Sequence, residues 1–212
     1  MGQAKNKRAR LQAAAGHLHE AACAASHALR RLTFAASEHI GSDCFVIAKL
    51  GQVLLADQGI ATELAVGYAA WRVGPGDSDV IAHTSAVPGH VPEGLTGLAY
   101  HAWLVLPEHG ALLDFTTYQL AMKGRRLDEF DGGHTQVDWC PDFLLAPVDH
   151  CKAYREVARA AGPVAFYYAP QPQLLALLES TFVMDEDNVR MARLVFKNPE
   201  AQVMGPRSLH SD

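Results

Sequence analysis

Three side chains of this sequence have the types that covalent acyl transfer requires: the thiol of Cys44, the imidazole of His101 and the carboxylate of Asp114. A cysteine attacks a carbonyl as its thiolate, and a histidine within hydrogen-bond reach can take up the thiol proton. A carboxylate behind the histidine orients the ring and stabilises its charged form. The residue types therefore suggest nucleophilic catalysis, provided that the elements that carry them bring them together.

Cys44 stands where the pattern predicts the start of a helix. Ser42 or Asp43 can cap exposed backbone N–H groups, and apolar residues recur at helical spacing in CFVIAKLGQVLLADQG, which ends at Gly59. The positive end of the helix dipole favours a thiolate at this position. A small buried hydrophobe is the simpler interpretation of any cysteine. The helix-start setting is not shared by the other three cysteines, Cys23, Cys140 and Cys151.

His101 and Asp114 are expected on the two strands of a hairpin. The segments AYHAWLVL and ALLDFTTY flank a four-residue turn at 107–110, so the numbers of paired residues sum to 217. His101 and Asp114 then share a face as diagonal neighbours, about 7–8 Å apart at the backbone. An aspartate in an apolar strand is costly to bury alone, which makes His101 its expected partner. Without that pairing, His101 is an ordinary half-buried histidine.

The surrounding pattern predicts an α+β protein, with N-terminal helices packed on a central antiparallel sheet and further helices at the C-terminal end. An Ala-rich helix is expected at 10–37, and a strand at 61–74. The remaining expected elements are strands at 79–83 and 137–145, helices at 150–161, 172–179 and 185–196, and an irregular segment at 119–133.

Length and composition predict a single domain over 1–212, since the chain has 212 residues, 49% of them hydrophobic and 19% charged. Residues 1–9 are expected to be disordered. The catalytic-type core is expected at 41–118, and a helical portion at 147–212.

Charge and hydropathy restrict the expected partners. A net charge of −5 argues against a nucleic-acid partner, and the sequence has no run of about 18 apolar residues that would span a membrane. The scattered cysteines lack CxxC spacing and are expected as thiols in a reducing compartment. We therefore expect a soluble cytoplasmic protein. No metal is expected, because no common zinc spacing is matched by His134, Cys140, His150 and Cys151.

The order of Cys44, His101 in YHAWLVLPEHG and Asp114 in ALLDFTT resembles the core motif of transglutaminase-like enzymes, which have a papain-type fold. Members of that superfamily carry the cysteine at the start of a helix and the histidine and aspartate on neighbouring strands. The resemblance covers about residues 41–118. Leader-peptide proteases of lasso-peptide maturation and arylamine acetyltransferases look similar at this level. The sequence departs from the family in the residues beside the cysteine, Asp43 and Phe45, where an aromatic residue or a glycine is usual.

The resemblance implies a cysteine-dependent hydrolase or acyl transferase that acts on an amide or peptide bond through a thioester acyl-enzyme. Cys44 would be the nucleophile, His101 the base and Asp114 the group that holds the ring. No cofactor is implied. The backbone N–H of Cys44 would be one donor to the oxyanion, and candidates for the second donor are Ser42, His39 and Tyr100. The expected lining residues are Ser42, Asp43, Tyr100 and Trp103, the last of which shields the pair from water or simply packs in the core.

The expected partner is a peptide, a protein or a small amide substrate. The loops at 75–97 and 119–135 are expected to border the cleft, because binding residues concentrate on loops over a rigid scaffold. Hydrolysis and acyl transfer both remain open, as does the oligomeric state. Two alternatives also stay open: a non-catalytic binding module that retains the transglutaminase-like fold, and an unrelated α+β domain in which Cys44 and His101 never meet.

Overall fold

The computed structural model describes residues 2–36, 43–84 and 99–206, with side chains from residue 14 onward. The chain divides into two compact units: unit 1 comprises residues 1–62 and 184–212, and unit 2 comprises residues 63–183. Helices and an antiparallel sheet both occur, so the predicted α+β class is confirmed. The single domain over 1–212 stays a prediction.

Unit 1 is helical in its described part, with α1 (Gly2–Ala35), α3 (Cys44–Ala56) and α7 (Glu186–Lys197) in mutual contact. Because α1 begins at Gly2, residues 2–9 are helical where the sequence predicts disorder. The end of α3 is joined to α7 by a bidentate ion pair, in which Arg193 Nε and Nη2 lie 2.7 and 2.9 Å from the carboxylate of Asp57. Arg31 of α1 donates to the carbonyls of Pro199 and Ala201, which ties the segment after α7 to α1.

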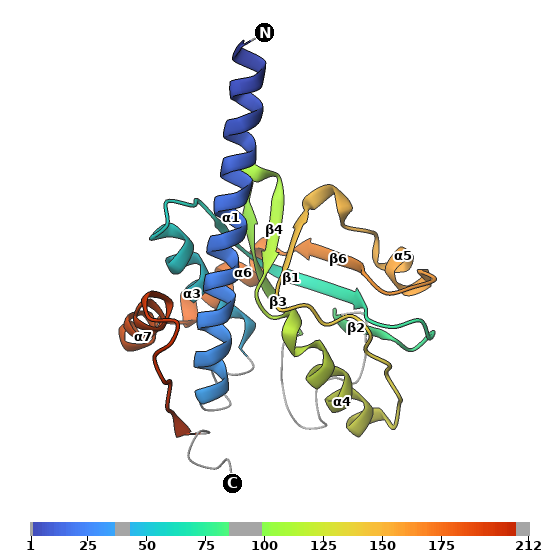
Figure 1. The fold of residues 1–212 in the computed structure, drawn as a ribbon. Helices are drawn as coiled ribbons and strands as arrows, with labels where there is room; N and C mark the ends of the chain where they lie inside the picture. Colours follow the sequence, from blue (N-terminus) through green and yellow to red (C-terminus); the bar gives the residue numbers. More distant parts are fainter. Residues whose placement is uncertain (1, 37–42, 85–98, 207–212) are drawn as a thin grey trace. The chain divides into compact units, whose positions relative to one another are not determined.

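Unit 2 is built on a six-stranded antiparallel sheet with the order β2-β1-β3-β4-β5, in which β6 also pairs with β1. Figure 1 shows β6 in orange running beside β1 in teal, although the two strands come from distant parts of the chain. The strands are β1 (Glu63–Arg72), β2 (Val80–His83), β3 (His101–Leu106), β4 (Ala111–Asp114), β5 (Leu144–Pro147) and β6 (Ala165–Pro170).

The hairpin of β3 and β4 has the predicted register. Leu104 pairs with Leu113 and Leu106 with Ala111, so the paired numbers sum to 217 as expected. The turn between them is a short 3-10 helix, η1 (Pro107–His109), followed by Gly110 in the left-handed conformation. A glycine adopts this conformation without steric cost, which explains why a tight turn forms at this point.

The two edges of β1 bring three other strands together. Ala69 pairs with His83 of β2 and with Tyr168 of β6. Gly67 pairs with His101 of β3 and also with β6. Because a strand has only two edges, β2 and β3 lie along the same edge of β1, opposite β6. Directly paired residues point to the same face of a sheet. The side chains of His83, His101 and Tyr168 therefore share one face.

That face carries the main core of unit 2, and the opposite face a smaller cluster of Ala70, Ala82 and Val157. The smaller cluster packs under α5 (Tyr154–Arg159). The buried residues of the main core are Ala65, Ala69, Trp71, Val73, Ile81, Trp103, Leu112, Leu120, Leu144, Ala146, Phe166 and Tyr168.

The segment 119–133, predicted to be irregular, is instead mostly helical: η2 (Thr117–Gln119) leads directly into α4 (Leu120–Asp131). Gly124 and several charges weaken the helical pattern in the sequence. In the fold, a Cβ at Gly124 would lie only 3.2 Å from a methyl group of Val137, so the glycine allows the helix to pack closely. The prediction of a loop at 119–135 was therefore wrong for most of that range.

Two further predictions at the C-terminal end need correction. The strand predicted at 137–145 is limited to β5, because the N–H groups of Asp138 and Trp139 both donate to the carbonyl of Val73 instead of forming a ladder. The portion 147–212 is not helical throughout. It contains η3 (Val148–His150), α5, α6 (Pro172–Thr181) and α7, but also strand β6, which the sequence analysis did not predict.

Candidate functional site

The carboxylate of Asp114 is fully buried at the end of β4 and accepts four hydrogen bonds. Its Oδ1 accepts from the backbone N–H and from the hydroxyl of Thr116, both at 2.8 Å. Its Oδ2 accepts from His101 Nε2 at 2.8 Å and from the Tyr168 hydroxyl at 2.7 Å. The hydrogen bond between His101 and Asp114 that the hairpin register predicts is therefore confirmed.

The direction of each proton in this cluster follows from Trp71. The indole nitrogen of Trp71 can only donate, and it lies 2.8 Å from the hydroxyl oxygen of Tyr168. The Tyr168 hydroxyl therefore accepts from Trp71 and directs its own proton to Asp114. The pKa of Asp114 is held well below its usual value, so the carboxylate is ionised, and His101 carries its proton on Nε2, the ring nitrogen 2.8 Å from that carboxylate.

The second ring nitrogen of His101, Nδ1, is buried and has no hydrogen-bond partner among the residues that the structure describes. Burial lowers the pKa of His101, and this outweighs the opposite effect of Asp114. Burial alone would raise the pKa of Asp114, but the adjacent His101 and the hydrogen bonds from His101 and Tyr168 hold it well below its usual value. The pair is thus a neutral imidazole on a carboxylate, with a lone pair on Nδ1 that can accept a proton.

Aromatic rings enclose His101 on several sides. The ring of Trp71 meets it edge-on at 4.8 Å between centroids, and the ring of Trp103 lies nearly parallel at 6.3 Å. His83 is stacked on it at 5.7 Å. Trp103 is itself buried in the main core, so it both packs there and lies beside the histidine. These rings exclude water from the pair, which strengthens its electrostatic interactions.

The stability of the fold should fall as the pH falls below about 6.5. In the folded chain, burial lowers the pKa of His101 below the ordinary value of 6.5. The unfolded chain therefore takes up the proton first, and the stability present above that pH is lost on acidification, by up to about 1.4 kcal/mol per pH unit for one group. Urea unfolding measured between about pH 7 and pH 5 gives this slope.

The matched variants for that measurement are His101→Gln and His150→Gln, because His150 is exposed. The slope of the unfolding free energy against pH should be smaller in His101→Gln, by the amount that one proton contributes, and unchanged in His150→Gln. Identical slopes in the wild type and in His101→Gln would contradict the neutral, buried state of His101.

Cys44 lies in unit 1, as the first residue of α3, and is 9% exposed. Of the two predicted caps, Ser42 and Asp43, the structure has Asp43, whose Oδ1 accepts from the N–H groups of Phe45 and Val46 at 2.9 and 3.4 Å. The negative charge of this carboxylate opposes the effect of the helix dipole on a thiolate at Cys44. The start of α3 by itself therefore gives little stabilisation to a thiolate at Cys44.

Of the remaining predicted lining residues, the structure describes Asp43 and Tyr100. Asp43 serves as the helix cap, and its orientation toward the backbone of α3 accounts for its presence. Tyr100 is half-buried immediately before β3. Ser42, His39 and the part of the predicted cleft loop at 85–97 lie outside the described residues. The described part of that loop, 75–84, forms a turn followed by β2.

The other three cysteines lie in settings unlike that of Cys44. Cys140 Sγ donates to the carbonyls of Thr117 and Tyr118 at 3.4 and 3.3 Å. Burial raises the pKa of Cys151, and the charge of Asp149 adds to this. Cys23 is exposed on α1, with its Sγ 3.6 Å from Nε2 of His19. None of these settings provides the start of a helix that Cys44 has.

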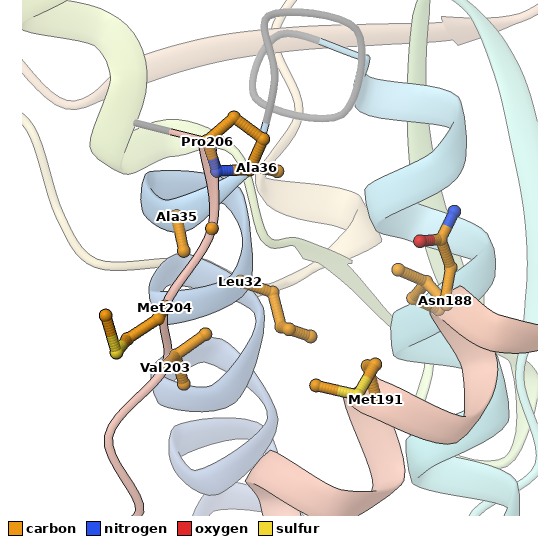
Figure 2. A pocket seen from close by; sticks show the side chains of 10 residues that line it. Leu32, Ala35, Ala36, Asn188, Met191, Val203, Met204 and Pro206 are labelled. Atoms are coloured by element: carbon orange, nitrogen blue, oxygen red, sulfur yellow. The ribbon is translucent and has the colours of Figure 1, made fainter. Parts of the chain in front are cut away.

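Unit 1 contains a separate pocket of about 300 Å³ between α1, α3, α7 and the segment after α7. Figure 2 shows Leu32 of α1 and Met191 of α7 pointing toward each other across it. No lining residue is titratable, so the pocket offers no group for acid–base chemistry. The lining residues are Leu32, Ala35, Ala36, Leu50, Asn188, Met191, Val203, Met204, Gly205 and Pro206.

The described part of the chain contains neither a metal-binding cluster nor a membrane-spanning helix. No group of three or more histidine, cysteine or acidic side chains is arranged to hold a metal ion there. Within the same residues, no helix has the length and apolar character that crossing a bilayer requires.

The sequence analysis missed Trp71 and Tyr168 as parts of this cluster. Thr116 was present in the ALLDFTT motif, but its role as a double donor to Asp114 was not predicted. A signal for Thr116 exists, since a hydroxyl two residues after an aspartate can bond to it locally. No local signal indicates Trp71 or Tyr168, because their place beside Asp114 depends on the pairing of β6 with β1.

Fold and site together define an α+β protein whose antiparallel sheet carries a buried histidine–aspartate pair. No family model matches the sequence, and no curated protein matches it. A solved crystal structure named genomics APC5867 is similar, with a TM-score of 0.56 and 15% sequence identity over 87% of this chain and 82% of that one. At that identity the likeness concerns the fold alone. The resemblance to transglutaminase-like enzymes stays a prediction.

Proposed function

We propose that this protein is a cysteine-dependent hydrolase or acyl transferase that acts on an amide or peptide bond, with Cys44 as nucleophile, His101 as base and Asp114 as the group that orients the ring. The observation that carries the proposal is the state of His101. Its Nε2 is held by an ionised carboxylate, while the buried Nδ1 has no partner in the described part of the chain. A ring held in this way is the form of histidine that accepts a proton from a nucleophile.

The burial of the pair supports a catalytic rather than a purely structural role. His101 and Asp114 are both 0% exposed, and a buried ionised carboxylate needs full compensation by its surroundings. Four donors supply that compensation for Asp114, whereas Nδ1 of His101 has no hydrogen-bond partner among the described residues. Perturbed titratable groups that also lack a partner are typical of functional sites.

The proposed reaction begins with transfer of the Cys44 thiol proton to Nδ1 of His101. The thiolate then attacks the carbonyl carbon of the substrate, and the carbonyl electron pair moves to its oxygen. When this oxyanion collapses, the C–N bond breaks and the amine leaves with the proton from Nδ1. The products of this half-reaction are a thioester on Cys44 and a free amine.

The second half-reaction releases the acyl group. Water, or an amine in the case of acyl transfer, attacks the thioester carbon and gives its proton to Nδ1. Collapse of the second oxyanion breaks the C–S bond, and the sulfur recovers the proton from Nδ1. Throughout both steps Asp114 stays ionised and stabilises the imidazolium form of His101. The proposal requires the Cys44 sulfur to come within hydrogen-bond reach of Nδ1, about 3–4 Å.

Acylation by an activated ester tests this function. With p-nitrophenyl acetate near neutral pH, the wild type should release a burst of one p-nitrophenol per chain and carry one acetyl group on Cys44. Mass spectrometry of the digested protein locates that group, and treatment with hydroxylamine should remove it, because a thioester is cleaved by hydroxylamine. We expect Cys44→Ala to abolish the burst.

Cys151→Ala is the matched control, because Cys151 is a partly buried thiol whose pKa burial raises. It should keep the full burst. Acetylation that spreads over lysines and other cysteines, at a level that Cys44→Ala does not change, would be evidence against the proposed nucleophile.

A further inference from the structure

Tyr168 donates its hydroxyl proton to the same oxygen of Asp114 that accepts from His101. We propose that Tyr168 is a positioning residue of this site, whose hydroxyl holds the Asp114 carboxylate in place and tunes how readily Nδ1 of His101 accepts a proton. The role of Tyr168 in catalysis rests on the proposed function. Its effect on the pKa of His101 can be measured without a substrate.

The backbone of β1 explains how Tyr168 reaches Asp114. Tyr168 is on β6 and Asp114 is on β4, so β1 and β3 lie between their strands in the sheet. Three successive residues on this face of β1 are small, Ala65, Gly67 and Ala69, and Trp71 of the cluster follows them. A Cβ at Gly67 would lie 2.1 Å from the carbonyl oxygen of Ala169, so the glycine is what permits the close approach of β6.

Trp71 removes the freedom of the Tyr168 hydroxyl to point elsewhere. Its Nε1–H occupies one lone pair of the hydroxyl oxygen at 2.8 Å, and the proton of the hydroxyl is then directed to Asp114 at 2.7 Å. Burial, and next the charge of Asp114, raise the pKa of Tyr168 well above its ordinary value, so the hydroxyl remains a donor.

The shared oxygen couples Tyr168 to the basicity of His101. A hydrogen bond from Tyr168 draws negative charge away from His101 and so stabilises the imidazolium form less than a carboxylate without that bond would. The other groups that face His101 are one lysine, the titratable ring of His83 and two indole rings. Lys123 of α4 lowers the pKa of His101 and also lies over the Trp71 ring at 5.3 Å. The rings are those of His83, Trp71 and Trp103.

The test is an NMR titration of His101 in the full chain, with its imidazole signal assigned by its loss in His101→Gln. In Tyr168→Phe we expect the pKa of His101 to rise by about 0.5 to 1 pH unit. The matched control is Tyr167→Phe, because Tyr167 is the neighbouring tyrosine on the other face of β6 and packs against Tyr154 at 6.0 Å. That variant should leave the pKa of His101 unchanged.

Equal pKa values of His101 in the wild type, Tyr168→Phe and Tyr167→Phe would overturn the inference, since the hydroxyl would then only pack. Tyr168→Phe leaves the buried indole N–H of Trp71 without an acceptor and could unfold the chain. The double variant Trp71→Phe/Tyr168→Phe removes both the donor and the acceptor of that hydrogen bond. A rise of the His101 pKa in this variant supports the inference, and an unchanged pKa overturns it. Failure of the proposed function shows separately, as loss of acylation at Cys44 with a normal titration of His101.

Discussion

Alkylation of Cys44 by iodoacetamide near pH 6 should slow by about 100-fold when His101 is replaced by alanine. An ordinary cysteine has a pKa of about 8.5, so only about 0.3% of it is thiolate at that pH. In the proposed site Nδ1 of His101 takes up the thiol proton as Cys44 reacts, and the imidazolium that forms is held by Asp114 through the other ring nitrogen. Without the ring, Cys44 reacts only through its ordinary thiolate fraction.

The pH profile separates this outcome from a general loss of access. Near pH 9 the wild type and His101→Ala should react at similar rates, since the thiolate then forms without a base. The exposed His150 provides the control variant His150→Ala, which should follow the wild type at every pH. A wild-type profile with a midpoint near 8.5, unchanged in His101→Ala, would favour the non-catalytic binding module or the unrelated α+β domain.

Replacement of Asp114 by asparagine should lower the free energy of unfolding by about 2–4 kcal/mol at neutral pH. The amide keeps the shape of the carboxylate, but its NH2 group can only donate where Oδ2 accepted two hydrogen bonds. One solution is a change of tautomer in His101, with the proton moved to Nδ1. The proton of the Tyr168 hydroxyl then still lacks an acceptor, because the neighbouring Trp71 Nε1–H can only donate.

Urea unfolding followed by fluorescence measures the change, and Asp149→Asn is the control at an exposed aspartate. That control should stay within about 0.5 kcal/mol of the wild type. The tautomer change adds a second readout, because the ¹⁵N shifts of His101 distinguish a proton on Nδ1 from one on Nε2. A loss smaller than about 1 kcal/mol, with the proton still on Nε2, would mean that the donors around Asp114 find other partners.

The parts of the site that could be predicted are those that local geometry determines. A four-residue turn that ends in Gly110 leaves one register for β3 and β4, so the sequence positions of His101 and Asp114 already imply their contact. The Asp43 cap of α3 is equally local, because it depends on backbone groups two and three residues away. Both predictions are confirmed.

Two errors have a common cause in contacts that the local pattern does not encode. Gly124 makes the segment of α4 look irregular in sequence, yet its lack of a side chain is what lets the helix approach Val137. The strand predicted before β5 does not form at Trp139, because the N–H of that residue donates to the carbonyl of Val73, just after β1. Packing of this kind depends on a partner that is distant in sequence.

The sequence by itself determined that a histidine and an aspartate meet in a hairpin and that a cysteine begins a helix, since each depends on contacts within about a dozen residues. Only the tertiary structure decided which other side chains surround that pair. Tyr168 and Trp71 reach the cluster because β6 closes a long loop to pair with β1, and no local pattern encodes such a pairing. Thr116 and His101 donate to Asp114 from within the hairpin, whereas the Tyr168 hydroxyl and the burial that keeps His101 neutral depend on the folded sheet.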